Sequence, residues 1–182
     1  NIFYELYCQE EEKDNAEFKC CMVVNHDEQV KVYSDIAKKL GITEKYGEVV
    51  SKASTFLNRH KDLDSVDVVF IDEAHLLFTQ GNKGYSGKNQ LDDIIKRAKV
   101  VVIVFDENQI LRMDQYWEKQ MIDRYRNKAI EQQNHITLTK QLRMQADNET
   151  LAWIDAFTKK QIINKIPHHD YEIKIFDSPE VL

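Results

Sequence analysis

Two runs of β-branched and aromatic residues, at 66–71 and 100–105, are the strongest hydrophobic features of the chain. Neither run alternates with polar positions, which is typical of a strand covered on both faces of a sheet. A third apolar run, at 17–24, is short enough to be another buried strand. Alternating apolar and polar residues at 135–139 and 171–176 predict two more strands.

Apolar residues between these runs recur at helical spacing. Asn25 and Asp27 are capping residues that predict the start of a helix, and Gly41 predicts its end. The apolar face expected for this helix consists of Val30, Tyr33, Ile36, Ala37 and Leu40. Further helices are expected at 1–9, 51–59, 91–98, 114–132 and 149–158. The segment 80–89 holds three of the five glycines and predicts a surface loop.

Strands that alternate with helices indicate a mostly parallel sheet with both faces covered. The predicted fold class is therefore α/β, with three layers in which helices lie on both faces of the sheet. The chain of 182 residues has the length of one ordinary domain. Because we find no internal repeat and no low-complexity linker, we expect residues 1–182 to form a single α/β domain.

The charge balance narrows the kinds of partner. The chain has 25 Lys and Arg against 31 Asp and Glu, a formal net charge of −6. This excludes a protein that coats nucleic acid through bulk positive charge, although a local basic groove remains open. No apolar run approaches the roughly 20 residues of a membrane-spanning helix. Acidic residues at 10–14 argue against a signal peptide, so a cytoplasmic protein without a membrane partner is expected.

The three cysteines are expected to be reduced thiols. Cys20 and Cys21 are neighbours, and a bridge between neighbours would be strained. Cys20, Cys21 and His26 could instead hold a metal ion, but no second ligand pair follows at the spacing of a zinc site. We favour the interpretation in which both thiols pack into the core of a strand.

Two predicted strands end at acidic residues, and these are the main candidates for chemistry. Asp72 and Glu73 follow the run at 66–71, and Asp106 follows the run at 100–105. Ligands of open parallel sheets bind at the carboxyl ends of the strands. Asp72 suits a magnesium ion, which prefers hard oxygen ligands. Glu73 could orient and deprotonate a water that attacks a phosphoryl group, and Gln109 could hydrogen-bond that water or a terminal phosphate.

Several of these segments resemble helicase motifs. Residues 68–75, Val-Val-Phe-Ile-Asp-Glu-Ala-His, resemble the Walker B segment of P-loop ATPases in its DEAH form. Residues 102–109 are similar to motif III of superfamily 1 helicases, and residues 23–41 resemble the strand and helix that follow the P-loop. Residues 138–143, Leu-Thr-Lys-Gln-Leu-Arg, resemble the motif in which an arginine approaches the terminal phosphate.

With 152–155 and 175–179 added, nearly the whole chain is similar to bacterial proteins of the DUF2075 group. These are P-loop NTPases with helicase-like and Schlafen-like relatives. The resemblance implies a RecA-like P-loop fold, with ATP and Mg²⁺ as cofactors and DNA or RNA as partner of the full-length protein.

The resemblance also implies roles for particular residues. Glu73, Gln109 and Arg143 would be catalytic, with Arg143 as an arginine finger because guanidinium matches phosphate oxygens. Asp72, which would hold the metal ion, and Asp106 would contribute to nucleotide binding. His75 would couple the catalytic acid to neighbouring motifs or cap the strand exit. For Arg143, a surface arginine after a strand is the alternative.

The chain departs from the family pattern in one important respect. The Walker A loop, Gly-x-x-x-x-Gly-Lys-[Ser/Thr], is expected before the first helix and is absent from the sequence. The segment 81–89 is similar to it, but five residues instead of four separate its first and last glycines, Asn89 replaces the hydroxyl residue, and the segment follows Walker B. The later helicase motifs are also expected beyond residue 182. We therefore expect this chain alone neither to bind nor to hydrolyse Mg-ATP.

Two other kinds of function remain open. One is a binding or regulatory module that has a P-loop-type fold without its phosphate cradle. The other is a metal-dependent phosphoester hydrolase built on Asp72, Glu73 and Asp106. Basic clusters at 96–99 and 124–128 could follow a nucleic-acid backbone or simply form solvated faces. The pair of histidines at 168–169 is not expected to share a metal ion.

Overall fold

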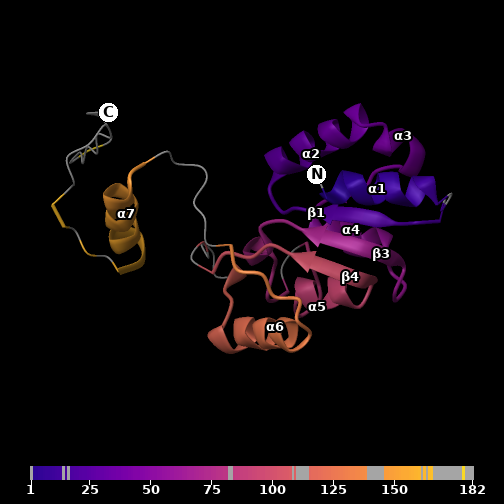
Figure 1. The fold of residues 1–182 in the computed structure, drawn as a ribbon. Helices are drawn as coiled ribbons and strands as arrows, with labels where there is room; N and C mark the ends of the chain where they lie inside the picture. The colour runs from indigo at the N-terminus through magenta and orange to yellow at the C-terminus, as the bar shows by residue number, and fades with distance from the viewer. Residues whose placement is uncertain are drawn as a thin grey trace. The chain divides into compact units, whose positions relative to one another are not determined.

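The computed structural model of the chain describes residues 2–13, 15, 17–81, 84–107, 109, 115–138, 146–160, 162, 164–165 and 178. These residues belong to two compact units, Asn1–Lys128 and Ala129–Leu182. The first unit carries the sheet and the candidate acids, and the second carries helix α7, Asn148–Lys160 (Figure 1).

The sheet of the first unit has four strands: β1 Cys20–Val23, β2 Val50–Ser51, β3 Val66–Ile71 and β4 Ala98–Ile103. All neighbouring pairs are parallel, in the order β2-β1-β3-β4. Val23 is in register with Ile71, and Ile71 with Ile103, so the carboxyl ends of three strands lie at one level. The prediction of a parallel α/β sheet is confirmed.

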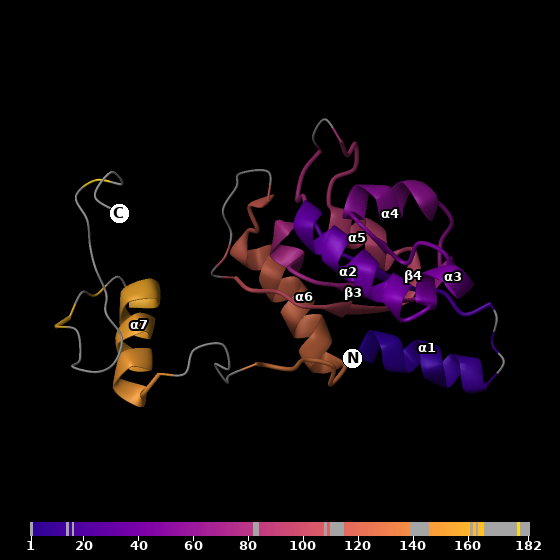
Figure 2. The ribbon, with the colours of Figure 1, turned by 90° about the horizontal axis from the view of Figure 1, so that it is seen from above.

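Helices cover both faces of this sheet (Figure 1; Figure 2). One face is packed by α1 Ile2–Glu12, α2 Asp27–Lys39 and α3 Ile42–Tyr46. The other is packed by α4 Ala53–Arg59, the short 3-10 helix η1 Ala74–Leu76, α5 Gln90–Ile95 and α6 Lys119–Glu131. The three expected layers are therefore present.

Alternate residues of the strands feed two hydrophobic cores. Cys20 joins the core under α1 and α2, and Cys21 joins the core under α4 and α5. Both thiols are free and buried. Burial raises the pKa of Cys20 to about 12 and that of Cys21 to about 11. The expectation that these neighbours pack in the core of a strand is confirmed.

Helix α1 runs opposite to the strands. Near its start, the ring of Phe3 contacts Phe70 at the end of β3, with 5.9 Å between ring centroids. Further along, the Tyr7 hydroxyl donates to the main-chain oxygen of Cys20 at the start of β1. The amino end of α1 therefore lies at the carboxyl edge of the sheet, as Figure 1 shows.

The prediction that the run at 100–105 is covered on both faces was wrong. Strand β4 begins at Ala98, and its residues Val100 and Val102 are 53% and 39% exposed, as is Val104 just after the strand, at 48%. Val100 and Val102 are in register with Val68 and Phe70, which belong to the core on the α1 side. Because β4 is an edge strand in the described part of the chain and α1 covers its neighbours, this face of β4 stays open.

Other boundaries differ by a few residues. The expected helix at 91–98 ends at Ile95, because Ala98 already pairs with Val66 in the sheet. On α2, Ala37 is buried as expected, but Ile36 and Leu40 are exposed. Gly41 does end this helix region, with a φ of 74° that favours glycine.

In the second unit, α7 matches the helix expected at 149–158. Trp153 is buried and stacks on Phe157, with ring centroids 5.5 Å apart. Residues 135–138 do not form the expected strand, and Ile136 and Leu138 are exposed. Arg143 and the segments 168–170 and 171–176 lie outside the described residues. Among the described helices, none combines the length and the apolar character needed to cross a membrane.

Candidate functional site

Asp72 is held in one orientation where β3 ends. Its main-chain N–H extends the sheet by donating to the oxygen of Val23, at 3.0 Å. Its carboxylate accepts the Tyr33 hydroxyl of α2 at 2.9 Å and the Glu73 N–H at 3.1 Å. Burial, and then the bond to Asp72, raise the pKa of Tyr33, so the phenol remains a hydrogen-bond donor. Asp72 itself is half-buried, which leaves part of it open to solvent.

Glu73 adopts an unusual backbone conformation for a residue with a side chain. Its φ of 53° and ψ of 48° lie in the left-handed region. The turn that this creates leads into η1 and brings the Glu73 carboxylate to within 3.1 Å of Nε2 of His75. Left-handed residues other than glycine cost stability and are often found at functional sites.

His75 joins the ends of the two strands. Its side chain is 2% exposed, and its Nδ1 accepts the main-chain N–H of Asp106 at 3.3 Å. With Nδ1 as acceptor, the ring donates through Nε2 to the Glu73 carboxylate. His75 therefore connects the acid after β3 to the backbone after β4. Since both ring nitrogens are engaged by the protein, its geometry suits a positioning residue.

Asp106 and Gln109 form the outer part of this arrangement. The Gln109 side-chain amide donates to Oδ2 of Asp106 at 2.7 Å, and the Gln109 N–H reaches the Asp106 main-chain oxygen at 3.3 Å. Gln109 is exposed and Asp106 is half-buried. The structure thus brings together Asp72, Glu73, His75, Asp106 and Gln109 at one edge of the sheet.

Three side chains from neighbouring segments hold the turn at Glu73 and η1 in place. The indole of Trp117 donates to the His75 main-chain oxygen at 3.1 Å, and the Gln115 amide donates to the Leu76 oxygen at 2.8 Å. Asn25 donates to the same Leu76 oxygen at 2.7 Å. These bonds satisfy main-chain groups that would otherwise be unpaired in a tight turn, and they fix η1 against both neighbouring strands.

Sequence reasoning missed part of this site. Tyr33 was expected only as a core residue of its helix, and the supporting roles of Asn25, Gln115 and Trp117 were not expected. The left-handed turn at Glu73 has no sequence signal, because glutamate rarely adopts it. The one available signal was that Tyr33 lies on the inward face of a helix directly after β1.

The expected basic clusters are largely neutralised by acids. Lys96 pairs with Asp93 at 3.2 Å and Lys99 with Asp67 at 2.7 Å. In α6, ion pairs join Arg124 to Asp92 at 3.0 Å and Arg126 to Glu107 at 2.7 Å. Each of these four cations is therefore paired with a nearby acid.

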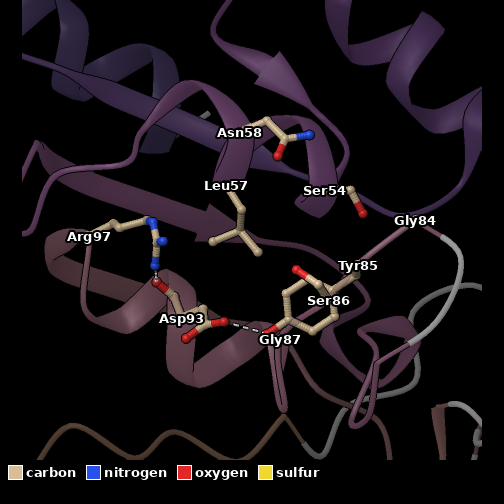
Figure 3. Close-up of a pocket in the computed structure, with 9 residues that line it drawn as sticks. All are labelled: Ser54, Leu57, Asn58, Gly84, Tyr85, Ser86, Gly87, Asp93 and Arg97. Atoms are coloured by element: carbon tan, nitrogen blue, oxygen red, sulfur yellow. Dashed lines mark hydrogen bonds between the residues drawn. The ribbon is translucent and has the colours of Figure 1, made fainter.

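In the part of the chain that the structure describes, no group of three or more His, Cys, Asp or Glu side chains is arranged to hold a metal ion. Asp72 alone is a suitable oxygen ligand for a magnesium ion that keeps most of its waters. A cavity of about 400 Å³ lies elsewhere, between α4 and α5, and none of the candidate acids lines it (Figure 3).

Comparisons with known proteins bear on this edge of the sheet. The chain is 34% identical over 154 residues to the uncharacterized protein YPL245W of Saccharomyces cerevisiae. The matched region covers 80% of this chain and 33% of that protein, so the chain spans about a third of the length of this relative. No solved structure matches the chain.

A family model described as "Schlafen group 3, DNA/RNA helicase domain" matches residues 1–182. The match spans both units and includes the two strand ends that carry the acids. The chain therefore belongs to the Schlafen group 3 DNA/RNA helicase domain family.

Proposed function

We propose that this chain forms the magnesium and water-activating side of an ATP site, in a protein that couples ATP hydrolysis to work on DNA or RNA. The observation that carries the proposal is the hydrogen-bonded connection from Glu73 through His75 to Asp106. Such a connection ties a catalytic acid to the neighbouring strand end, where a terminal phosphate can be sensed. The chain spans about a third of the length of its yeast relative, and we propose the activity for the full-length protein.

Each acid has a role that suits its contacts. Asp72, oriented by Tyr33, would hold Mg²⁺, and the ion would neutralise the charge of the phosphates. Glu73 has one carboxylate oxygen on His75, which leaves the other oxygen to take a proton from the attacking water. Asp106 and Gln109 would contact that water or the terminal phosphate, and Arg143 would stabilise the transition-state charge.

Topology supports a place for the missing phosphate cradle. The chain passes from β1 to β2 through α2 and α3, which lie on one face of the sheet, and this connection leads toward the β2 edge. The connections through α4, from β2 to β3, and through α5, from β3 to β4, lie on the other face and lead toward the β4 edge. Helix α1 leads into β1 on the first of these faces. Crossover connections between parallel strands are right-handed, so a strand that precedes α1 would lie on the β3 side of β1. Because β3 and β4 already occupy the nearest positions on that side, this strand would lie beyond β4.

The open face of β4 fits this position. A strand beyond β4 would end at the same edge as Asp72, and its connection to the amino end of α1 would be a phosphate-binding loop at a helix start. The loop would supply the N–H donors, the lysine and the hydroxyl ligand that this chain lacks. The narrower resemblance to the DUF2075 group remains a prediction.

Two alternatives make different predictions. A regulatory module without a cradle would bind no nucleotide even at full length. A metal-dependent phosphoester hydrolase would need the acids to share an ion, and the absence of a three-ligand group among the described residues speaks against it.

The test is calorimetric titration with Mg-ATP. We expect the full-length protein to bind, the 182-residue chain alone not to bind, and Asp72→Asn in the full-length protein to weaken magnesium-dependent binding. Asp123→Asn is a matched control, since that aspartate pairs with Arg126 on the surface of α6. Micromolar binding by the 182-residue chain, or unchanged binding by Asp72→Asn, would refute the proposed site.

A further inference from the structure

The cavity between α4 and α5 is separate from the acidic edge, and both polar and apolar side chains line it. Its volume of about 400 Å³ is in the range of small-molecule sites. Its walls come from α4, the glycine-containing loop at 84–87, α5 and Arg97 (Figure 3). Figure 3 shows the side chains of Leu57 and Tyr85 entering the same space from opposite elements.

Tyr85 is a fixed wall of this cavity. Its hydroxyl donates to Oδ2 of Asp93 at 2.5 Å. Gly87 lies directly against it: a Cβ at that position would be 2.2 Å from the Tyr85 hydroxyl oxygen and 2.6 Å from Oδ2 of Asp93. A side chain at 87 would therefore force the Tyr85 hydroxyl or the Asp93 carboxylate to shift. Burial and the bond to Asp93 raise the pKa of Tyr85, so the hydroxyl stays a donor.

The polar groups of the cavity retain hydrogen-bonding capacity. Arg97 donates through Nε to the His60 oxygen and through one terminal nitrogen to the Asp93 oxygen, both at 2.6 Å. Its other terminal nitrogen has no partner among the described residues, and Arg97 makes no ion pair there. The Asn58 side chain is exposed to solvent beside the cavity and makes no hydrogen bond in the described part of the chain. Figure 3 shows Asn58 and Arg97 at separate positions around the cavity, with the Arg97 guanidinium directed toward Asp93.

The opposite charges of the two ionised side chains that line the cavity disfavour a simple anion as its ligand. Asp93 and Arg97 line the same cavity, so its formal charge is balanced, and a phosphate group near Arg97 would also face a carboxylate. A purely apolar ligand over the half-buried Arg97 would leave one terminal nitrogen of its guanidinium unpaired. The fitting ligand is therefore an uncharged planar ring with apolar faces and a polar edge.

We propose that this cavity takes one base of a single-stranded nucleic acid. The faces of the base would lie against Tyr85 and Leu57, and its edge would bond to Asn58 and Arg97. Aromatic and aliphatic walls tolerate any base, because every base has an apolar face. The inference rests on the proposed function, in which DNA or RNA is the partner, and it adds a specific contact for that partner.

The test compares two labelled oligomers of ten nucleotides by fluorescence anisotropy with the 182-residue chain. One oligomer carries bases, and the other is abasic with the same backbone. We expect the base-carrying oligomer to bind about tenfold more tightly. Asn58→Ala should reduce that preference about fivefold, and Gly87→Ala, which displaces the Tyr85 hydroxyl, should reduce it as well. Asn127→Ala, at an exposed position of α6, is the matched control and should have no effect.

Each result has a distinct meaning. Equal binding of the two oligomers, or an unchanged preference in Asn58→Ala, overturns the base site and leaves nucleic-acid binding intact. If neither oligomer binds, adenosine and uridine are titrated while the amide NMR signals are followed. Shifts confined to 54–58 and 84–87 then support the base site and contradict the nucleic-acid partner. If the NMR signals do not shift, the base site is overturned as well. The ATP proposal is tested separately by its own calorimetry.

Discussion

Replacing His75 with leucine tests whether this histidine joins the two strand ends. The side chain is 2% exposed, and leucine fills a similar volume without hydrogen-bonding atoms. The substitution removes the bond to the Glu73 carboxylate and leaves the Asp106 N–H without its acceptor. Glu73 is 26% exposed, so water can replace part of its loss.

The expected cost follows from these two bonds. One lost hydrogen bond contributes about 1 kcal/mol, and loss of the acceptor of the half-buried Asp106 N–H costs about 1–2 kcal/mol more. The free energy of unfolding should fall by about 2–3 kcal/mol, and Tm by about 5–10 °C for a chain of this size. Urea denaturation followed by circular dichroism measures the first value, and a thermal scan measures the second.

The matched control is His135→Leu, because His135 is exposed. It should change the free energy of unfolding by less than about 0.5 kcal/mol. If His75→Leu were as stable as this control, the hydrogen-bonded link between Glu73 and Asp106 would be refuted.

Two further predictions concern titrating groups of the first unit. At pH 8, Cys20 and Cys21 should resist alkylation in the folded chain and react fully in urea. Their pKa values of about 12 and 11 leave about a thousandth or less of each thiol ionised. Mass spectrometry counts the labelled sites, and rapid labelling of the folded strand would contradict the buried placement. Burial opposes ionisation of Asp67, but hydrogen bonds from Lys99 and the Lys19 N–H outweigh it and lower the pKa of this carboxyl. Its stabilisation is therefore present above the ordinary value near 3.8 and is lost as pH falls through the lowered value. Asp67→Asn should destabilise the chain near neutral pH and have less effect near about pH 2, and an equal effect at both would contradict the assignment.

The fold class could be predicted from the sequence because β1, β3 and β4 each carry their own signal, whereas the two-residue strand β2 was not predicted. The run at 66–71 is apolar except for Asp67, and it forms β3 with those bounds. The run at 100–105 gives the same local signal, yet β4 has an open face. Whether a neighbour covers a strand depends on tertiary packing, which a local pattern does not encode. The same reason accounts for Ile36 of α2, which has helical spacing but lies exposed.

The site could be predicted as far as strand ends determine it. Asp72 and Asp106 follow adjacent parallel strands, so topology brings them to one edge. The bond from Tyr33 to Asp72 joins residues 39 positions apart, and its partner could not be read from spacing. The role of His75 depends on which nitrogen faces Asp106, and that is set by the left-handed turn at Glu73. Arg143 remains a prediction, because it lies outside the described residues.

The most direct measurement is the ATPase turnover of the full-length protein carrying Glu73→Gln, beside Glu107→Gln. Both glutamates follow an aspartate at a strand end, but Glu107 is exposed and pairs with Arg126. We expect Glu73→Gln to lower turnover about a hundredfold or more with ATP binding nearly intact, and Glu107→Gln to keep turnover close to that of the unmodified protein. Equal turnover of Glu73→Gln and the unmodified protein would contradict the assignment of this carboxylate as the base.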